Sequence, residues 1–141
     1  MKRLALMLCL LAPHAFAGDT VEIVDGDTLL LDGSEVGLFG IDAPELGALC
    51  RRGSDDSDCG VLARAALLDL TAGAEVVCNG VNGAPGKVLC RANGYDLSEG
   101  MIYTGWARAL AGEGRRYVAL EGRARIAERG LWSGFELLSE E

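Results

Sequence analysis

Four cysteines constrain the fold of this chain most, because disulfides fix which residues must lie side by side. They are Cys50, Cys59, Cys78 and Cys90, an even number that can pair without remainder. Of the three pairings, we expect Cys50–Cys59 with Cys78–Cys90, because each bond then closes a short local loop. A zinc site is the alternative, but no CxxC pair and no nearby histidine supports it.

A fifth cysteine, Cys9, lies in an N-terminal stretch typical of a secretory signal peptide. Two basic residues precede an apolar run over residues 4–11 and a small-x-small cleavage site at residues 15–17. The run is too short to span a bilayer, and a buried N-terminal helix is the alternative interpretation. We expect residues 1–17 to be a signal peptide and residues 18–141 to form one domain. The product is then exported, periplasmic or secreted, where disulfides persist.

The charge of the expected mature chain disfavours avid binding of polyanions. Two of the 13 basic residues leave with the signal, so 11 remain against 21 acidic residues, a formal charge of −10. Proteins that bind phosphate backbones nonspecifically normally carry a basic face. The only histidine, His14, also leaves with the signal, which excludes a histidine base and imidazole metal ligands. Chemistry must then come from carboxylates, a hard metal ion, arginine, lysine, tyrosine or serine.

The pattern of apolar and turn-forming residues predicts an α+β fold that is mainly a β barrel. Strands are expected over residues 20–24, 28–31, 35–41, 74–78 and 87–91. Helices are expected over residues 59–70, from Asp96 to Trp106 and over about 117–129, with Gly130 as the last stop. Residues 46–58 are expected to form a loop, and residues 107–110 to be extended. This order of elements is that of a five-stranded OB-fold with about three helices.

Two segments resemble the signature motifs of the staphylococcal nuclease-like (thermonuclease) family. Residues 24–28 read Val-Asp-Gly-Asp-Thr and residues 41–45 read Ile-Asp-Ala-Pro-Glu. Supporting features follow in order as far as the Gly-Leu-Trp-Ser-Gly segment at residues 130–134, so the resemblance covers essentially the whole mature chain. It implies a five-stranded OB barrel and Ca²⁺-dependent hydrolysis of phosphodiesters in DNA or RNA.

The resemblance also implies roles for residues at matching positions. Asp27 and Asp42 fall where the family's metal-binding carboxylates lie, and the backbone carbonyl of Ala43 would complete the protein's ligands. Glu45 falls at the family's proposed general-base position. Ca²⁺ accepts about six to eight oxygens in irregular geometry, so this set, waters and a substrate phosphate would form a workable site. Each residue also has an ordinary explanation as a turn, cap or solvated loop residue.

Two positions depart from the family's pattern. Active members carry an arginine in the third strand, where this chain has Gly37, and another just before the fifth strand. Residues 82–87 lack that second arginine, and only Lys87 offers a cation there. Removing one charge-stabilising donor lowers a rate by roughly 10² to 10³. Arg51 and Arg52 are candidate replacement cations, although they also have a plain interpretation as loop residues that balance nearby aspartates.

Three functions remain open at this point. In the first, the domain keeps a weak Ca²⁺ site, has lost catalysis and binds single-stranded nucleic acid, another polymer or a protein partner of the cell envelope. In the second, it is an active secreted nuclease that uses Arg51 and Arg52. In the third, it is a disulfide-stapled structural protein and the acidic cluster is accidental. We favour the first, and expect a monomer with no membrane span.

Overall fold

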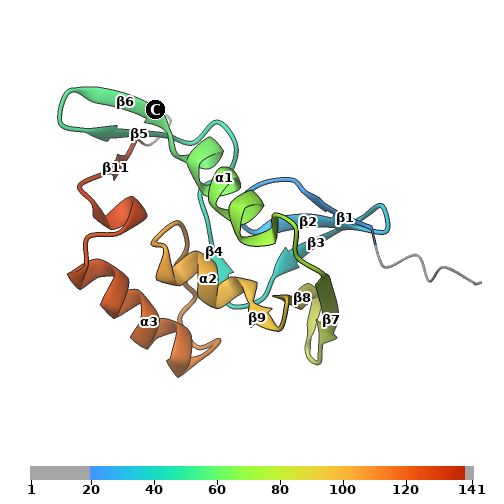
Figure 1. Cartoon of the computed structure of the whole chain (residues 1–141). Coiled ribbons are helices and arrows are strands. Elements are labelled where there is room, and N and C mark those ends of the chain that lie inside the picture. Colours follow the sequence, from blue (N-terminus) through green and yellow to red (C-terminus); the bar gives the residue numbers. More distant parts are fainter. Residues whose placement is uncertain (1–19, 139–141) are drawn as a thin grey trace, which may run out of the picture.

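The computed structural model describes residues 20–138 as an α+β fold with three helices and a strongly curled mixed sheet (Figure 1). The expected signal peptide lies outside the described residues. The sheet order is β1 (Val21–Ile23), β2 (Thr28–Leu31), β3 (Ser34–Leu38), β8 (Ala84–Ala92) and β7 (Val76–Val81). Only β3 and β8 run parallel in this order. The sheet curls into a half-barrel, and its end strands β1 and β7 do not pair within residues 20–138.

Glycine-containing turns set the ends of several strands. Asp32 and Gly33 adopt φ values of 49° and 80°, as a tight turn between β2 and β3 requires. Gly83, with φ of 77°, lies in the equally short connection between β7 and β8. Because that turn is so tight, both strands extend beyond the ends expected at residues 78 and 87.

The expected third strand, residues 35–41, is interrupted. It divides into β3 and the two-residue β4 (Ile41–Asp42), which pairs with β10 (Arg108–Ala109). Gly40 separates them with φ of 79°, and the ring of Tyr117 occupies the space where a side chain at residue 40 would lie. The break therefore coincides with a tertiary contact that only a glycine allows. The expected extended segment after the second helix is confirmed as β10.

The expected loop over residues 46–58 is wrong from residue 49 onwards. This segment forms a hairpin of β5 (Leu49–Arg52) and β6 (Asp55–Asp58), and β11 (Glu136–Leu137) pairs with β5. Gly53, with φ of 63°, allows the tight turn. The hairpin lacks the apolar alternation that identifies a half-buried strand, which explains why its sequence did not indicate one.

The three helices lie close to their expected positions. Helix α1 (Cys59–Thr71) begins where the Asp58 side chain accepts a hydrogen bond from the Val61 N–H at 2.9 Å. Helix α2 (Leu97–Tyr103) is capped in the same way by Asp96, but it ends before the expected Trp106. Helix α3 (Arg115–Ile126) starts and ends earlier than expected, and a 3-10 turn, η1 (Gly130–Trp132), follows it.

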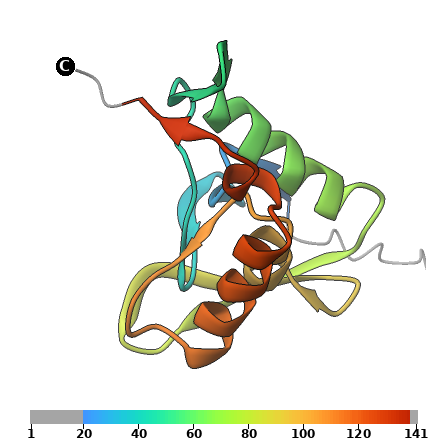
Figure 2. The same cartoon turned by 90° about the vertical axis from the view of Figure 1, so that its left-hand side faces the viewer.

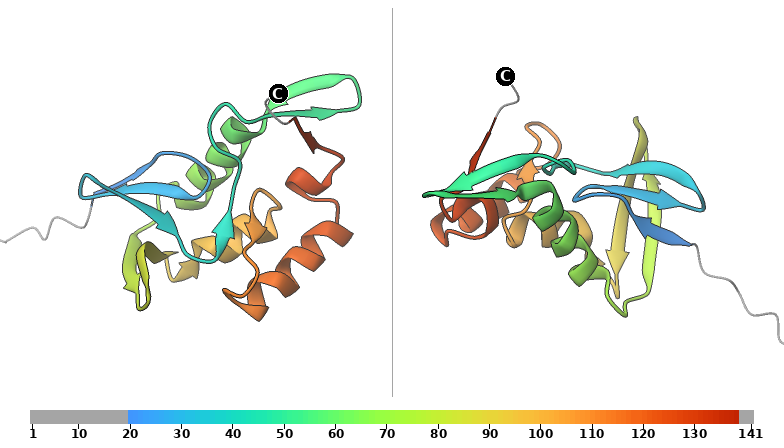
Figure 3. Two further views of the ribbon diagram at one scale, coloured as in Figure 1. Left: turned by 180° about the vertical axis from the view of Figure 1, so that it is seen from behind. Right: turned by 90° about the horizontal axis from the view of Figure 1, so that it is seen from above.

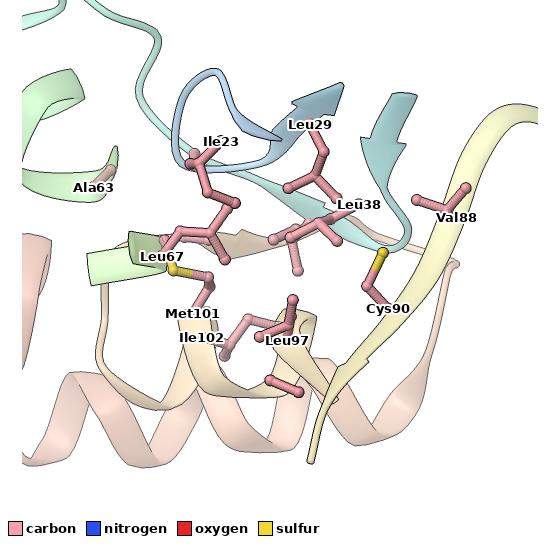
Figure 4. Packing of buried hydrophobic residues seen from close by; sticks show 14 of the residues in the cluster. Ile23, Leu29, Leu38, Ala63, Leu67, Val88, Cys90, Leu97, Met101 and Ile102 are labelled. Carbon is pink, nitrogen blue, oxygen red and sulfur yellow. The ribbon is translucent and has the colours of Figure 1, made fainter. Parts of the chain in front are cut away.

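Helix α1 lies between the curled sheet and the β5–β6 hairpin, while α2 and α3 pack together on another side (Figures 1, 2 and 3). The main core fills the concave side of the sheet (Figure 4). Leu29, Leu38, Leu67, Met101 and Ile102 are fully buried there. Within residues 20–138, no helix combines the length and hydrophobicity needed to cross a bilayer.

Both expected disulfides are present, Cys50–Cys59 and Cys78–Cys90. The first ties β5 to the start of α1 and forms a small second core with Leu131. The second joins directly opposite residues of β7 and β8. Each bond therefore stabilises a local unit of the fold.

Reduction should lower the free energy of unfolding of the mature protein. The bonds span 9 and 12 residues, and each should contribute about 2 to 3 kcal/mol by restricting the unfolded chain. Urea denaturation with and without reductant measures this loss. The paired variants Cys50→Ser/Cys59→Ser and Cys78→Ser/Cys90→Ser separate the two bonds. An unchanged unfolding midpoint under reductant would contradict both contributions.

Candidate functional site

The two acidic motifs meet through the carboxylate of Asp27. Its Oδ2 accepts a hydrogen bond from the Ala43 N–H at 2.8 Å, and its Oδ1 accepts one from the Thr28 hydroxyl at 3.1 Å. The Asp25 carboxylate accepts the Asp27 N–H at 3.0 Å, which fixes the turn before β2. Segments 16 residues apart are thereby joined through one partly buried side chain.

Burial raises the pKa of Asp27 above its ordinary value of 3.8. The hydrogen bond from Ala43 lowers the pKa and the nearby charge of Asp25 raises it, but loss of hydration is the largest of these effects. The carboxylate is therefore held in a setting that favours its neutral form. A bound cation would offset this by stabilising the ionised form.

Two glycines let the backbone approach α1 closely at this point. A Cβ at Gly26 would lie 2.8 Å from the Cβ atoms of both Ala43 and Ala63, so the first motif packs directly on the second and on α1. A Cβ at Gly60 would overlap the carbonyl oxygen of Glu45. The loop after β4 therefore rests on the first turn of α1, and only residues without bulk fit at these two contacts.

The second acidic motif lies beside this contact between the loop and α1. It contains Asp42, Ala43 and Glu45. Asp42 is exposed and lies opposite Arg108 in the β4–β10 pair, whereas Ala43 is buried. Glu45 is exposed, and its backbone carbonyl accepts the Ala48 N–H at 3.0 Å. Within residues 20–138, no group of three His, Cys, Asp or Glu side chains is arranged to hold a metal. The Asp27–Ala43 contact thus joins two segments without assembling a full cage of carboxylates.

Arg51 and Arg52 lie on the β5–β6 hairpin and have partners there. Arg51 Nε and Nη2 donate to the two carboxylate oxygens of Asp56, directly opposite, at 2.6 and 3.1 Å. The Arg52 guanidinium lies 4.8 Å from the ring centroid of Phe135. The hairpin projects from the N-terminal end of α1, on the other side of that helix from the curled sheet (Figure 3).

Lys87 takes a position that depends on the absence of a side chain at Gly37. The two residues are neighbours in the parallel β3–β8 pair, and Thr28 lies opposite Gly37 on β2. The Lys87 ammonium nitrogen lies 2.7 Å from where a Cβ of residue 37 would be. The lysine side chain therefore lies across β3, and no ion pair holds it among the residues that the structure describes.

Arg64 has a contact in the fold that none of the sequence motifs indicated. Its guanidinium donates to the Ile23 carbonyl at 3.3 and 3.4 Å, from a half-buried position on α1. The available signal was a single cation within the otherwise largely apolar sequence of α1.

Gly60→Ala should destabilise the protein by at least about 2 kcal/mol, because the new methyl group must displace the Glu45 loop. Urea denaturation measures the effect. Gly122→Ala is the matched control: Gly122 lies in α3 with open space around it, so alanine there should be neutral or stabilise by about 1 kcal/mol. Equal effects of the two substitutions would contradict the close contact.

The stability advantage of wild type over Asp27→Asn should decrease as pH rises. Asp27 has a folded-state pKa above its ordinary 3.8, so its favourable contribution is present below about pH 3.8 and is lost as pH rises through the raised value. Urea denaturation of both proteins between about pH 3 and pH 7 provides the comparison. A difference that does not vary with pH would contradict a raised pKa.

Comparison of the chain with models of known protein families and with curated proteins finds no match.

Proposed function

We propose that this chain is an exported OB-fold domain of the staphylococcal nuclease-like family that binds a ligand but has lost efficient nuclease catalysis. The order of the five main strands, with β3 beside β8, supports an OB-type half-barrel. OB-folds are five-stranded and often only partly closed. Two disulfides are consistent with folding outside the reducing cytoplasm and support export.

The hydrogen bond between the Asp27 carboxylate and the Ala43 N–H carries this proposal. Here the carboxylate of the first motif contacts the backbone of the second, and Gly26 packs against the same Ala43. This contact supports treating the two motifs as parts of one site.

The assigned residues suit weak Ca²⁺ binding by donor type, and within residues 20–138 they do not form a cluster of three acidic side chains. Asp27, Asp42 and the Ala43 carbonyl are hard oxygen donors of the kind that Ca²⁺ prefers, and waters would supply the rest. Asp27 is desolvated and already accepts two hydrogen bonds, which lowers its capacity as a ligand. When bound, the ion would offset negative charge on an anionic ligand. Glu45, on an exposed loop beside α1, is the only base that the resemblance supplies.

The charge-stabilising part of a nuclease site is much reduced. At the two positions where the resemblance implies arginines, the chain offers Gly37 and the single cation Lys87, which is a point charge without the planar fork of a guanidinium. Arg51 and Arg52 are engaged by Asp56 and Phe135 on the β5–β6 hairpin. Each missing donor corresponds to roughly 10² to 10³ in rate. Binding of a polymer or an envelope protein is therefore the better-supported function.

The test is a comparison of hydrolysis by wild type and by an arginine-restored variant. Purified residues 18–141 are incubated with single-stranded DNA and RNA, with Ca²⁺ or a chelator. Wild type should show no cleavage above Asp27→Asn. Gly37→Arg/Lys87→Arg should gain at least about 10²-fold in Ca²⁺-dependent cleavage, because both charge-stabilising groups return. In the native chain the atoms nearest to a Cβ at residue 37 belong to the flexible end of the Lys87 side chain, so an arginine at residue 87 can turn aside to admit it.

Two controls make the outcome decisive. Glu45→Gln in the restored variant should remove the gained activity, and calorimetric titration of wild type with Ca²⁺ should give weak binding that Asp27→Asn abolishes. Cleavage by wild type that is lost in Asp27→Asn would show that catalysis survives, and the binding proposal would be wrong. A folded double variant without any gain would count against the assigned site itself.

A further inference from the structure

An open groove lies along the line where the half-barrel fails to close. It has a volume of about 430 Å³ and is bordered by β1, by α1, and by Ala74 and Val76 where the chain enters β7. Its apolar lining comprises Val21, Ile23, Leu68, Ala74 and Val76. We call it the seam groove. Its volume lies within the range of ordinary ligand sites.

Two free strand edges border the seam groove. β1 and β7 are the end strands of the sheet order, so within residues 20–138 each has one edge without a strand partner. A free edge presents unpaired backbone N–H and C=O groups. Those groups match the backbone of another extended polypeptide, which is the basis of recognition by strand addition. β7 is the better template because it spans six residues, against three in β1.

Arg64 supplies a positive charge in this groove. It extends from α1 to the Ile23 carbonyl of β1, so it covers part of the β1 edge and leaves the β7 edge free. None of the ion pairs within the described residues involves Arg64. Glu22 also borders the groove, but strand alternation directs its side chain to the opposite face from Val21 and Ile23. A half-buried guanidinium without a carboxylate partner is suited to a carboxylate from outside.

We propose that the seam groove binds an extended peptide segment of a partner protein, which adds as a strand to the β7 edge and places a carboxylate against Arg64. Apolar side chains on alternate residues of the segment contact Val21, Leu68 and Val76. A peptide segment with one carboxylate is repelled far less by the acidic net charge of the chain than a nucleic acid, in which every nucleotide carries a phosphate. This site does not depend on the acidic site of Asp27.

The test uses an acetylated six-residue peptide of alternating valine and threonine that ends in a free carboxylate. It is titrated into residues 18–141 and followed by amide chemical shifts. Shifts should be confined to β1, β7 and the part of α1 that carries Arg64. The same peptide with an amidated C-terminus should bind about tenfold more weakly, because it lacks the charge that pairs with Arg64. A peptide N-methylated at alternate residues should not bind, since it cannot pair with a strand edge.

Arg64→Gln is the matched protein variant, because its amide can still donate to the Ile23 carbonyl. It should bind the acid and amide peptides equally, at the weaker affinity. Arg91→Gln, on the exposed side of β8, should leave both affinities unchanged. Equal binding of acid and amide peptides by wild type, or shifts outside the groove, would overturn the proposal. So would binding of laurate without binding of the peptide, which would identify the site as one for lipid carboxylates.

Discussion

Close contact between α1 and the two acidic segments is the constraint on which the rest of this structure depends. Small residues make it: Gly26 approaches Ala43 and Ala63, and Gly60 lies against the Glu45 carbonyl. At these distances packing forces, which are short-ranged, hold the backbone without large side chains. The hydrogen bond from Ala43 to Asp27 then forms between segments that are already positioned. The residues that pack α1 against the sheet are thus the same residues, or direct neighbours of the residues, that form the candidate site.

A second fixed point lies at Tyr117, on the opposite side of the core. Its ring fills the space beside Gly40, and its hydroxyl donates to the Asp96 carboxylate at 2.9 Å. Asp96 also caps α2, so one tyrosine joins the break after β3, the start of α2 and the body of α3. Burial and the nearby Asp96 charge raise the pKa of Tyr117, so the phenol remains a hydrogen-bond donor.

Local signals predicted the parts of the fold that local chemistry decides. Asp58 and Asp96 cap the helices expected after them, the turn at Asp32 and Gly33 lies where it was expected, and the cysteines pair with their neighbours in sequence. The break at Gly40 could not be predicted, because the ring that it accommodates lies 77 residues away along the chain. The position of the Lys87 side chain could not be predicted either, because it depends on the register between β3 and β8, which are distant in sequence. For the candidate site, the motifs in the sequence suggested the acidic residues, whereas the contact of Asp27 with Ala43 and the pairing of Arg51 with Asp56 are properties of the assembled fold.

The pattern of disulfides has a consequence for how the chain can oxidise. Each cysteine of residues 20–138 is bonded to its nearest neighbour in sequence, first Cys50 with Cys59 and then Cys78 with Cys90. In a chain that emerges from a membrane pore with its amino end first, each pair is complete before the next pair appears. When the first disulfide forms, no thiol of the second pair is therefore present to compete. Oxidation of the cysteines in the order in which they emerge gives the native connectivity. Such a chain has little need of a disulfide isomerase.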